Sequence, residues 1–207
     1  MKNFSKLILA ALATVVAASA CNKEPDYNSL PVPIPNAVDL GLSVKWTDAN
    51  IGTTIPYEAG YYYAWGEIVP KSDYSSGTYL DTNFDVVLTK IGSPLRTPTK
   101  AEWEELLNTD NCNISWETFS EEVEIPGLRI TSRKEGFTDA SIFLPAAGMR
   151  SGREITDLKY TPCGRYWSSS QDKDKEKSWH VTFSDEGGEH ILCTARHLGM
   201  NVRAVWP

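Results

Sequence analysis

Residues 164–183, GRYWSSSQDKDKEKSWHVTF, contain two β-prone segments separated by a highly charged one. The first segment, residues 165–169, contains two adjacent aromatic side chains, Tyr166 and Trp167, which favour strands. In the second, residues 178–183, polar and apolar side chains alternate, as in a strand with one buried face. We therefore expect two scaffold strands joined by a solvated hairpin tip of mixed charge at residues 171–177.

The alternation in the second strand predicts where its side chains point. Trp179, Val181 and Phe183 share one face, which we expect to be buried. His180 falls on the other face, which we expect to be exposed to solvent. The following segment, residues 184–189, contains two adjacent glycines and predicts a second hairpin turn.

Three consecutive serines, Ser168, Ser169 and Ser170, raise the question of a nucleophile. A serine nucleophile needs a base within hydrogen-bond reach and a group that orients that base. None of the three lies in a Gly-x-Ser-x-Gly elbow, and the histidines have no motif context. The sequence favours a strand with Tyr166 or Trp167 in the core and hydroxyls that satisfy backbone groups. Serines that line a binding surface are the alternative, and we predict no catalytic residue.

Acidic residues alternate in the charged segment, at Asp172, Asp174 and Glu176. Calcium prefers six to eight oxygen ligands, and the lysines between these acids would repel the ion. We therefore predict a solvated loop, with no metal and no cofactor.

One helix is clearly indicated near residues 99–108. Thr99 and Glu102 have the spacing of a capping box, in which each side chain accepts a hydrogen bond from the other residue's backbone N–H. Its apolar face consists of Trp103, Leu106 and Leu107.

The rest of the domain is expected to consist of short strands bounded by Gly, Pro, Asp or Asn. These further strands are residues 44–46, 61–65, 128–132, 141–149, 190–194 and 201–206. One helix among many strands predicts an α+β domain of mostly short antiparallel strands, with long irregular loops.

The chain begins like a bacterial lipoprotein. Two lysines precede an apolar run at residues 7–18, which is too short to span a bilayer, and residues 18–21 read ASAC. This pattern resembles a lipobox, which implies a signal peptide at residues 1–20 and lipid attachment at Cys21. The alternative is a secreted protein with an incidental cysteine.

Four prolines in residues 21–36 predict an extended tether, and residues 37–207 form one domain with one core. Cleavage after residue 20 would remove two lysines and no acids, so the formal net charge changes from −7 to −9. An acidic chain is a poor candidate for nucleic-acid binding, so we expect no nucleic-acid partner.

Three cysteines remain once Cys21 is lipidated, so at most one disulfide can form among Cys112, Cys163 and Cys193. The periplasm and cell surface permit disulfides. We expect the bond between Cys163 and Cys193, because both flank predicted strands late in the chain.

Seven tryptophans and nine tyrosines serve two expected purposes. Trp46, Trp103 and Trp206 lie in strand or helix patterns and are expected in the core. Other aromatics are candidates for exposed side chains that stack on sugars or anchor interfaces. These candidates are Tyr61, Tyr62, Tyr63, Tyr74, Tyr79 and Trp116, joined by Ser169 and Ser170 as a ligand-binding surface.

Several motifs occur in a characteristic order. They are residues 37–46 (AVDLGLSVKW), 62–67 (YYAWGE), 96–106 (RTPTKAEWEEL), 142–148 (IFLPAAG), 166–170 (YWSSS) and 202–205 (VRAV). In this order they resemble the Fibrobacter succinogenes major paralogous domain, found in lipoproteins and secreted proteins of the Bacteroides group. The resemblance implies a C-type-lectin-like fold whose N- and C-terminal strands pair, related to formylglycine-generating factors, and a role in adhesion or recognition.

The resemblance also separates the alternatives for function. The calcium-binding Glu-Pro-Asn and Trp-Asn-Asp motifs of sugar-binding lectins are absent, so recognition would be calcium-independent. Cys163 and Cys193 do not reproduce the cysteine pair of the formylglycine-generating factors. We expect an outer-membrane lipoprotein, on the cell surface or periplasmic face, with a non-catalytic module that binds a glycan or an envelope or host protein. The alternatives are a divergent enzyme with a reactive thiol at Cys163 or Cys193, and a structural or assembly subunit of the envelope.

Overall fold

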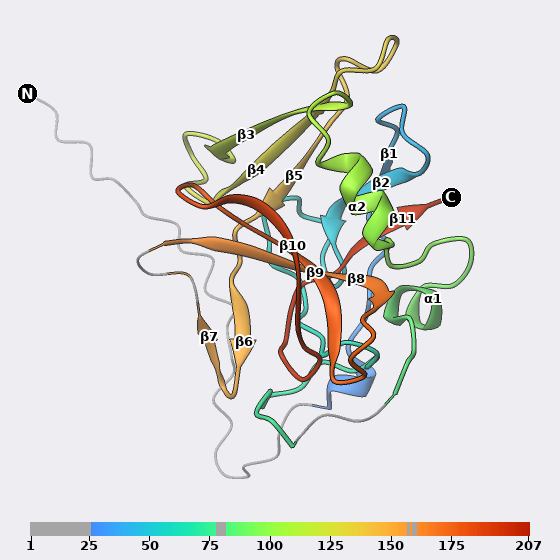
Figure 1. Ribbon diagram of the computed structural model, residues 1–207, viewed down its shortest axis with the longest axis vertical. Helices are drawn as coiled ribbons and strands as arrows, with labels where there is room; N and C mark the ends of the chain where they lie inside the picture. The colour runs from blue at the N-terminus through green and yellow to red at the C-terminus, as the bar shows by residue number, and fades with distance from the viewer. Residues whose placement is uncertain (1–25, 78–81, 157, 159–160) are drawn as a thin grey trace, which may run out of the picture.

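The computed structural model describes residues 26–77, 82–156, 158 and 161–207. Within these parts of the chain, short antiparallel strands predominate (Figure 1). The helices are η1 (Tyr27–Ser29, a 3-10 turn), α1 (Val86–Lys90) and α2 (Lys100–Leu106). The predicted mostly antiparallel class is confirmed, and α1 is a helix that the sequence analysis did not predict.

The first sheet joins the two ends of the domain, in the order β1 (Ala37–Val38), β2 (Lys45–Asn50) and β11 (Arg203–Trp206). Both outer strands run antiparallel to β2, and Trp46 pairs with Val205. The resemblance implied that the N- and C-terminal strands pair, and this pairing is present.

The second sheet contains residues 164–183, in which two strands were predicted. Its order is β10 (Gly188–Ala195), β9 (Lys177–Ser184) and β8 (Cys163–Gln171). Both neighbouring pairs are antiparallel, so the two predicted hairpins are confirmed.

The third sheet has the order β3 (Cys112–Thr118), β4 (Pro126–Ser132) and β5 (Ser141–Pro145). A separate hairpin follows it, formed by β6 (Met149–Ser151) and β7 (Glu154–Thr156). The strands β4 and β5 were predicted from the sequence, whereas β3 was not, because polar residues make up much of its sequence (CNISWET).

Two clusters of buried side chains hold the sheets together. In the first, Trp46 and Trp103 have ring centroids 4.6 Å apart, and Tyr166 stacks on Phe183 at 5.8 Å. In the second, Trp167 packs with residues of the 63–65 segment and with those before β11. Because side chains alternate across a strand, the adjacent aromatics of β8 enter different clusters.

The capping box at the start of α2 is confirmed. Thr99 Oγ1 accepts a hydrogen bond from the Glu102 amide at 3.3 Å, and Glu102 Oε2 accepts one from the Thr99 amide at 2.7 Å. Ser170 Oγ accepts a further bond from the Lys100 amide at 2.9 Å. These contacts tie the helix to the end of β8.

Two predictions of exposure were wrong. His180 is only 2% exposed, because both faces of β9 are covered in the folded chain. Trp206 was expected in the core and is 41% exposed, because it lies opposite the exposed Lys45 on β2 while Val205 takes the buried face.

The predicted strand at residues 61–65 was also wrong. Its residues form only an isolated bridge, between Tyr63 and Met200, and its aromatics fill the clusters instead. The described part of the predicted tether contacts the domain: Pro31 O accepts a hydrogen bond from Tyr61 Oη at 3.2 Å. Asn36 Nδ2 bonds Asp48 Oδ2 at 2.9 Å.

Candidate functional site

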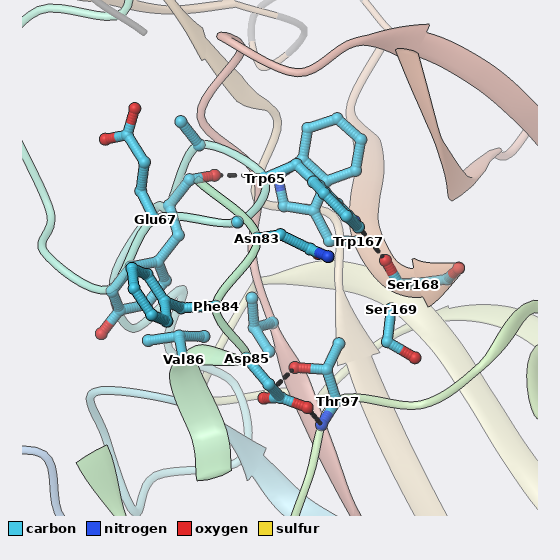
Figure 2. Close-up of a pocket in the computed structure, with 14 residues that line it drawn as sticks. Trp65, Glu67, Asn83, Phe84, Asp85, Val86, Thr97, Trp167, Ser168 and Ser169 are labelled. Carbon is cyan, nitrogen blue, oxygen red and sulfur yellow. Dashed lines mark hydrogen bonds between the residues drawn. The ribbon is translucent and has the colours of Figure 1, made fainter. Parts of the chain in front are cut away.

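A recess of about 90 Å³ lies where the 63–67 segment, the 83–86 segment and β8 meet (Figure 2). Two indoles line it, those of Trp65 and Trp167, and both side chains are buried. Trp65 Nε1 donates to Ser168 O at 2.7 Å, and Trp167 Nε1 donates to Tyr63 O at 2.8 Å. With their N–H groups engaged, the indoles offer mainly ring surface to an occupant.

The carboxylates that line this recess are held by the protein. Asp85 caps α1, and its Oδ1 accepts hydrogen bonds from the Val87 amide and from Thr97 Oγ1, both at 2.9 Å. Its Oδ2 accepts the Thr97 amide at 2.9 Å, so the side chain points towards Thr97 in Figure 2. Glu67 is buried and pairs with Lys71 Nζ at 2.8 Å. These contacts fix the polar wall before any ligand arrives.

Phe84 is the prominent exposed side chain of the site. It is 58% exposed and lines two hollows, the recess above and a second of about 100 Å³ with Ile68, Val69 and Thr82. Leu88, four residues further along the chain, is also exposed. We call this surface the Phe84 site. Its hollows are smaller than a ~150 Å³ cavity that holds benzene, so each suits a small protruding group.

The tyrosines predicted to form an exposed ligand surface lie elsewhere. Tyr62, Tyr63 and Tyr74 are buried, which corrects the prediction. Tyr62 Oη donates to Ala147 O at 2.5 Å, and Tyr74 Oη donates to Tyr62 O. Tyr61 is half-buried, and Tyr79 lies outside the described residues. The hydroxyls of Tyr62 and Tyr74 connect loops, which is why an aromatic-rich irregular segment became interior.

The remaining predicted binding residues do not share one surface. Trp116 is half-buried and packs edge-on against Phe183, with ring centroids 6.4 Å apart. Ser169 lines the Phe84 site, and its amide donates to Pro98 O at 2.8 Å. Ser170 Oγ bonds the backbone of α2. Ser169 Oγ also donates to Pro98 O at 3.3 Å, so the interpretation of the Ser169 and Ser170 hydroxyls as partners for backbone groups is confirmed. Of the three consecutive serines, Ser168 and Ser169 line the recess.

The predicted disulfide between Cys163 and Cys193 was wrong, since Cys112, Cys163 and Cys193 are all free thiols. Cys163 lies opposite Ser184 on β9, whereas Cys193 lies opposite Trp179. Five residues of strand separate those positions by about 17 Å. Disulfide-bonded residues have Cα atoms within about 7 Å.

The thiols also face different surroundings. Cys163 Sγ is buried 3.2 Å from Thr182 Oγ1, and Cys193 Sγ donates to Asp172 Oδ2 at 3.1 Å. Burial, followed by the neighbouring carboxylate, raises the pKa of Cys193 to about 11. Burial also raises the pKa of Cys112 to about 11. At neutral pH both thiols are protonated and therefore weak nucleophiles.

The acidic residues of the hairpin tip stabilise its turns. Asp172 Oδ1 accepts the Asp174 amide, and Asp174 Oδ1 accepts the Glu176 amide, both at 3.0 Å. Across the described part of the chain, no three His, Cys, Asp or Glu side chains are grouped to hold a metal ion. In that same part, no helix has the length and apolar character needed to cross a membrane.

Sequence reasoning missed the most exposed part of the site. The motifs at residues 62–67 and 166–170 contain Trp65 and Trp167, but Phe84 follows no periodic pattern. Phe84 could have been found from its sequence neighbours, because in Thr82-Asn83-Phe84-Asp85 it is an aromatic residue among polar, turn-forming ones.

Comparison with known proteins adds no relative: no family model, curated protein or solved structure matches this chain. Cys21 and the predicted signal peptide lie outside the described residues.

Proposed function

We propose that this protein is an outer-membrane lipoprotein whose domain is a non-catalytic module that binds a glycan or a protein without calcium. The observation that carries this proposal is the Phe84 site, in which an exposed aromatic ring stands between two hollows. Aromatic faces stack on sugar rings and anchor protein interfaces. The supporting residues already satisfy one another, so the site is preorganised and offers shape and ring surface.

The volumes of the hollows indicate how a ligand would bind. A hollow of about 90–100 Å³ does not enclose a whole sugar ring or a large side chain. A ligand would instead lie across Phe84 and insert small groups, such as methyl or hydroxymethyl groups, on either side. This arrangement suits an extended surface, such as a glycan chain or a protein, better than an isolated metabolite.

A glycan array and a screen of envelope and host proteins, run with and without EDTA, test the proposal. We expect a ligand whose binding is unaffected by EDTA and is weakened at least tenfold by Phe84→Ser. Leu192→Ser is the matched control, because Leu192 on β10 is 49% exposed and lies outside the Phe84 site. Equal loss in both variants, or no ligand for the folded protein, would contradict the proposal.

The anchor is tested separately from the binding site. Cys21→Ala should prevent incorporation of labelled fatty acid and release the protein from the membrane fraction. Protease treatment of intact cells then distinguishes the two membrane faces, since only a surface domain is digested before lysis. A Cys21→Ala protein that remains lipid-labelled would contradict the lipid attachment at Cys21.

A further inference from the structure

A second and larger cleft, of about 550 Å³, shares no described lining residue with the Phe84 site. The tip of the β8–β9 hairpin contributes Lys175 and Glu176, and the segment after β10 contributes Arg196 and His197. Ser76 and Gly77 complete the described lining. This volume lies within the ~300–1,000 Å³ range of small-molecule sites, whereas the hollows beside Phe84 do not.

Arg196 is held rigidly in the wall of this cleft. Its amide donates to Glu176 O at 3.0 Å, and its Nε donates to Lys177 O at 3.1 Å. Its guanidinium carbon lies 4.2 Å from the ring centroid of Trp65, a cation–π contact. The side chain is only 5% exposed. Its orientation is therefore fixed before any ligand binds.

The hydrogen bonds of this guanidinium are incomplete. Nη2 is buried and has no acceptor in the described parts of the chain, and no carboxylate there forms an ion pair with Arg196. A buried charged donor without an acceptor is costly, and such groups often mark a site for an ion or ligand. The guanidinium fork matches the geometry of a carboxylate.

The neighbouring charges add a modest preference for anions. Lys175 is exposed and has no ion-pair partner among the described residues, while Glu176 supplies one opposing charge. The formal charges of Lys175, Arg196 and Glu176 in the lining sum to +1. This lining contrasts with a whole chain of formal net charge −7.

We propose that this cleft binds an acidic saccharide, with the sugar carboxylate placed against Arg196 and Lys175. The volume accommodates a sugar unit, and Ser76 and the backbone beside Gly77 and Ala195 offer polar groups without bulky side chains. A protein partner would need a broad interface rather than an enclosed cleft. This site stands independently of the Phe84 site, because the two share no described lining residue. They are connected only through the packing of the Arg196 guanidinium on the Trp65 indole.

Titration calorimetry on the full lipidated chain in detergent tests the proposal. The probes are a galacturonate disaccharide, the matching neutral galactose disaccharide, inorganic sulfate and a glutamate-rich peptide. We expect binding of the galacturonate disaccharide and at least tenfold weaker binding of each other probe. Binding should also weaken with added salt.

Two hairpin-tip variants separate the cleft from general charge effects. Lys175→Glu should weaken galacturonate binding by about fivefold or more, because it replaces an attraction with a repulsion. Lys173→Glu is the matched control, because it makes the same exposed charge reversal at a residue outside the cleft and should change affinity less than twofold. Both positions are exposed, so neither variant threatens the fold.

Arg196→Lys retains the charge but loses the fork, and its binding should fall at least tenfold while the circular dichroism spectrum is unchanged. If Arg196→Lys unfolds, the comparison of Lys175→Glu with Lys173→Glu tests the proposal by itself. Equal weakening by Lys173→Glu and Lys175→Glu overturns the proposal, as does equal or tighter binding of the neutral disaccharide, sulfate or peptide. Failure of every probe to bind also overturns it. Phe84→Ser should leave galacturonate binding intact, so failures of the two sites are distinguishable.

Discussion

At the scale of single residues, His180 carries the clearest pH dependence. Its ring lies between the strand neighbours Trp167 and Leu192, and it is edge-on to Trp167 with ring centroids 5.9 Å apart. Neither ring nitrogen has a hydrogen-bond partner among the described side chains and backbone groups. Burial, and then the positive charge of Arg165, lower the pKa of His180 to about 4.

This shift predicts a loss of stability in acid. Between pH 6.5 and pH 4 the unfolded chain binds a proton at His180 that the folded chain does not, so the free energy of unfolding falls as the pH falls. The loss attributable to His180 is about 3 kcal/mol. Urea unfolding of wild type and His180→Phe at pH 7, 5.5 and 4 should show it.

The loss of stability in acid that is due to His180 should be absent in His180→Phe. His190→Gln, at an exposed position, should retain this loss. Contributions of the carboxylates cancel in the comparison, because they are common to all three proteins. Parallel pH curves for wild type and His180→Phe would show that His180 does not titrate in this way.

The free thiols give a second prediction at this scale. Intact mass should be unchanged by reductant, with Cys112, Cys163 and Cys193 all reduced. In the folded protein, labelling of Cys193 by a thiolate-selective reagent should be slow at pH 7 and rise towards pH 11, where its thiolate forms. A mass lower by two hydrogen atoms in the unreduced protein would contradict this, because it would indicate a disulfide. Urea should abolish the slow labelling.

At the scale of elements, the capping box of α2 is the strongest local device. Thr99→Ala removes the side-chain acceptor for the Glu102 amide and should lower the free energy of unfolding by about 1 kcal/mol. Thr109→Ala, at an exposed threonine just after the helix, should change stability by less than about 0.5 kcal/mol. Chemical denaturation of both variants checks this difference, and equal effects would contradict the role of the cap.

The pairing of β8 with β9 depends on close contact between Gly164 and Phe183. A Cβ added at Gly164 would lie 2.0 Å from Cζ of the Phe183 ring. Gly164→Ala should therefore destabilise the protein by about 2 kcal/mol through overpacking. In a Phe183→Leu background the same change should cost at least about 1 kcal/mol less, because the clashing ring is gone. If the effects of Gly164→Ala and Phe183→Leu on the free energy of unfolding were additive, the contact between these two residues would not be the cause of the destabilisation.

Elements that are determined by residues close together in the sequence could be predicted. Features that depend on contacts between segments far apart in the sequence could not. The Thr99 cap and the β8–β9 hairpin follow from spacing within a few residues, and both are confirmed. His180 was predicted to be exposed because alternation describes one strand, whereas its burial depends on what covers the opposite face. Likewise Phe84 joins Trp65 and Trp167 only because loops far apart in sequence meet, and no local pattern encodes that meeting.

At the scale of the whole molecule, the strands β2 and β11 connect the two buried clusters. Trp46 on β2 and Val205 on β11 belong to the first cluster, whereas Ala204 on β11 and Ile51, directly after β2, belong to the second. Arg203 is fully buried between them: its Nη1 donates to Thr47 O at 3.0 Å on β2, and its Nη2 donates to Phe143 O at 2.7 Å on β5. Burial lowers the pKa of Arg203, and the nearby Tyr166 and Asp48 oppose this shift in part.

Because the same strands build both clusters, we expect them to unfold as one cooperative unit. Native-state hydrogen exchange should give the same opening free energy for the slowest amides around each cluster, such as Ile130 on β4 and Tyr63 beside Met200. In Arg203→Lys a single ammonium nitrogen cannot occupy the positions of both Nη1 and Nη2, so it cannot bond both carbonyls as the guanidinium does. This substitution should lower the opening free energy of both clusters equally, by about 2–3 kcal/mol. Two different opening energies in wild type, or a loss confined to one cluster in the variant, would mean that the clusters fold independently and that β2 and β11 only connect them.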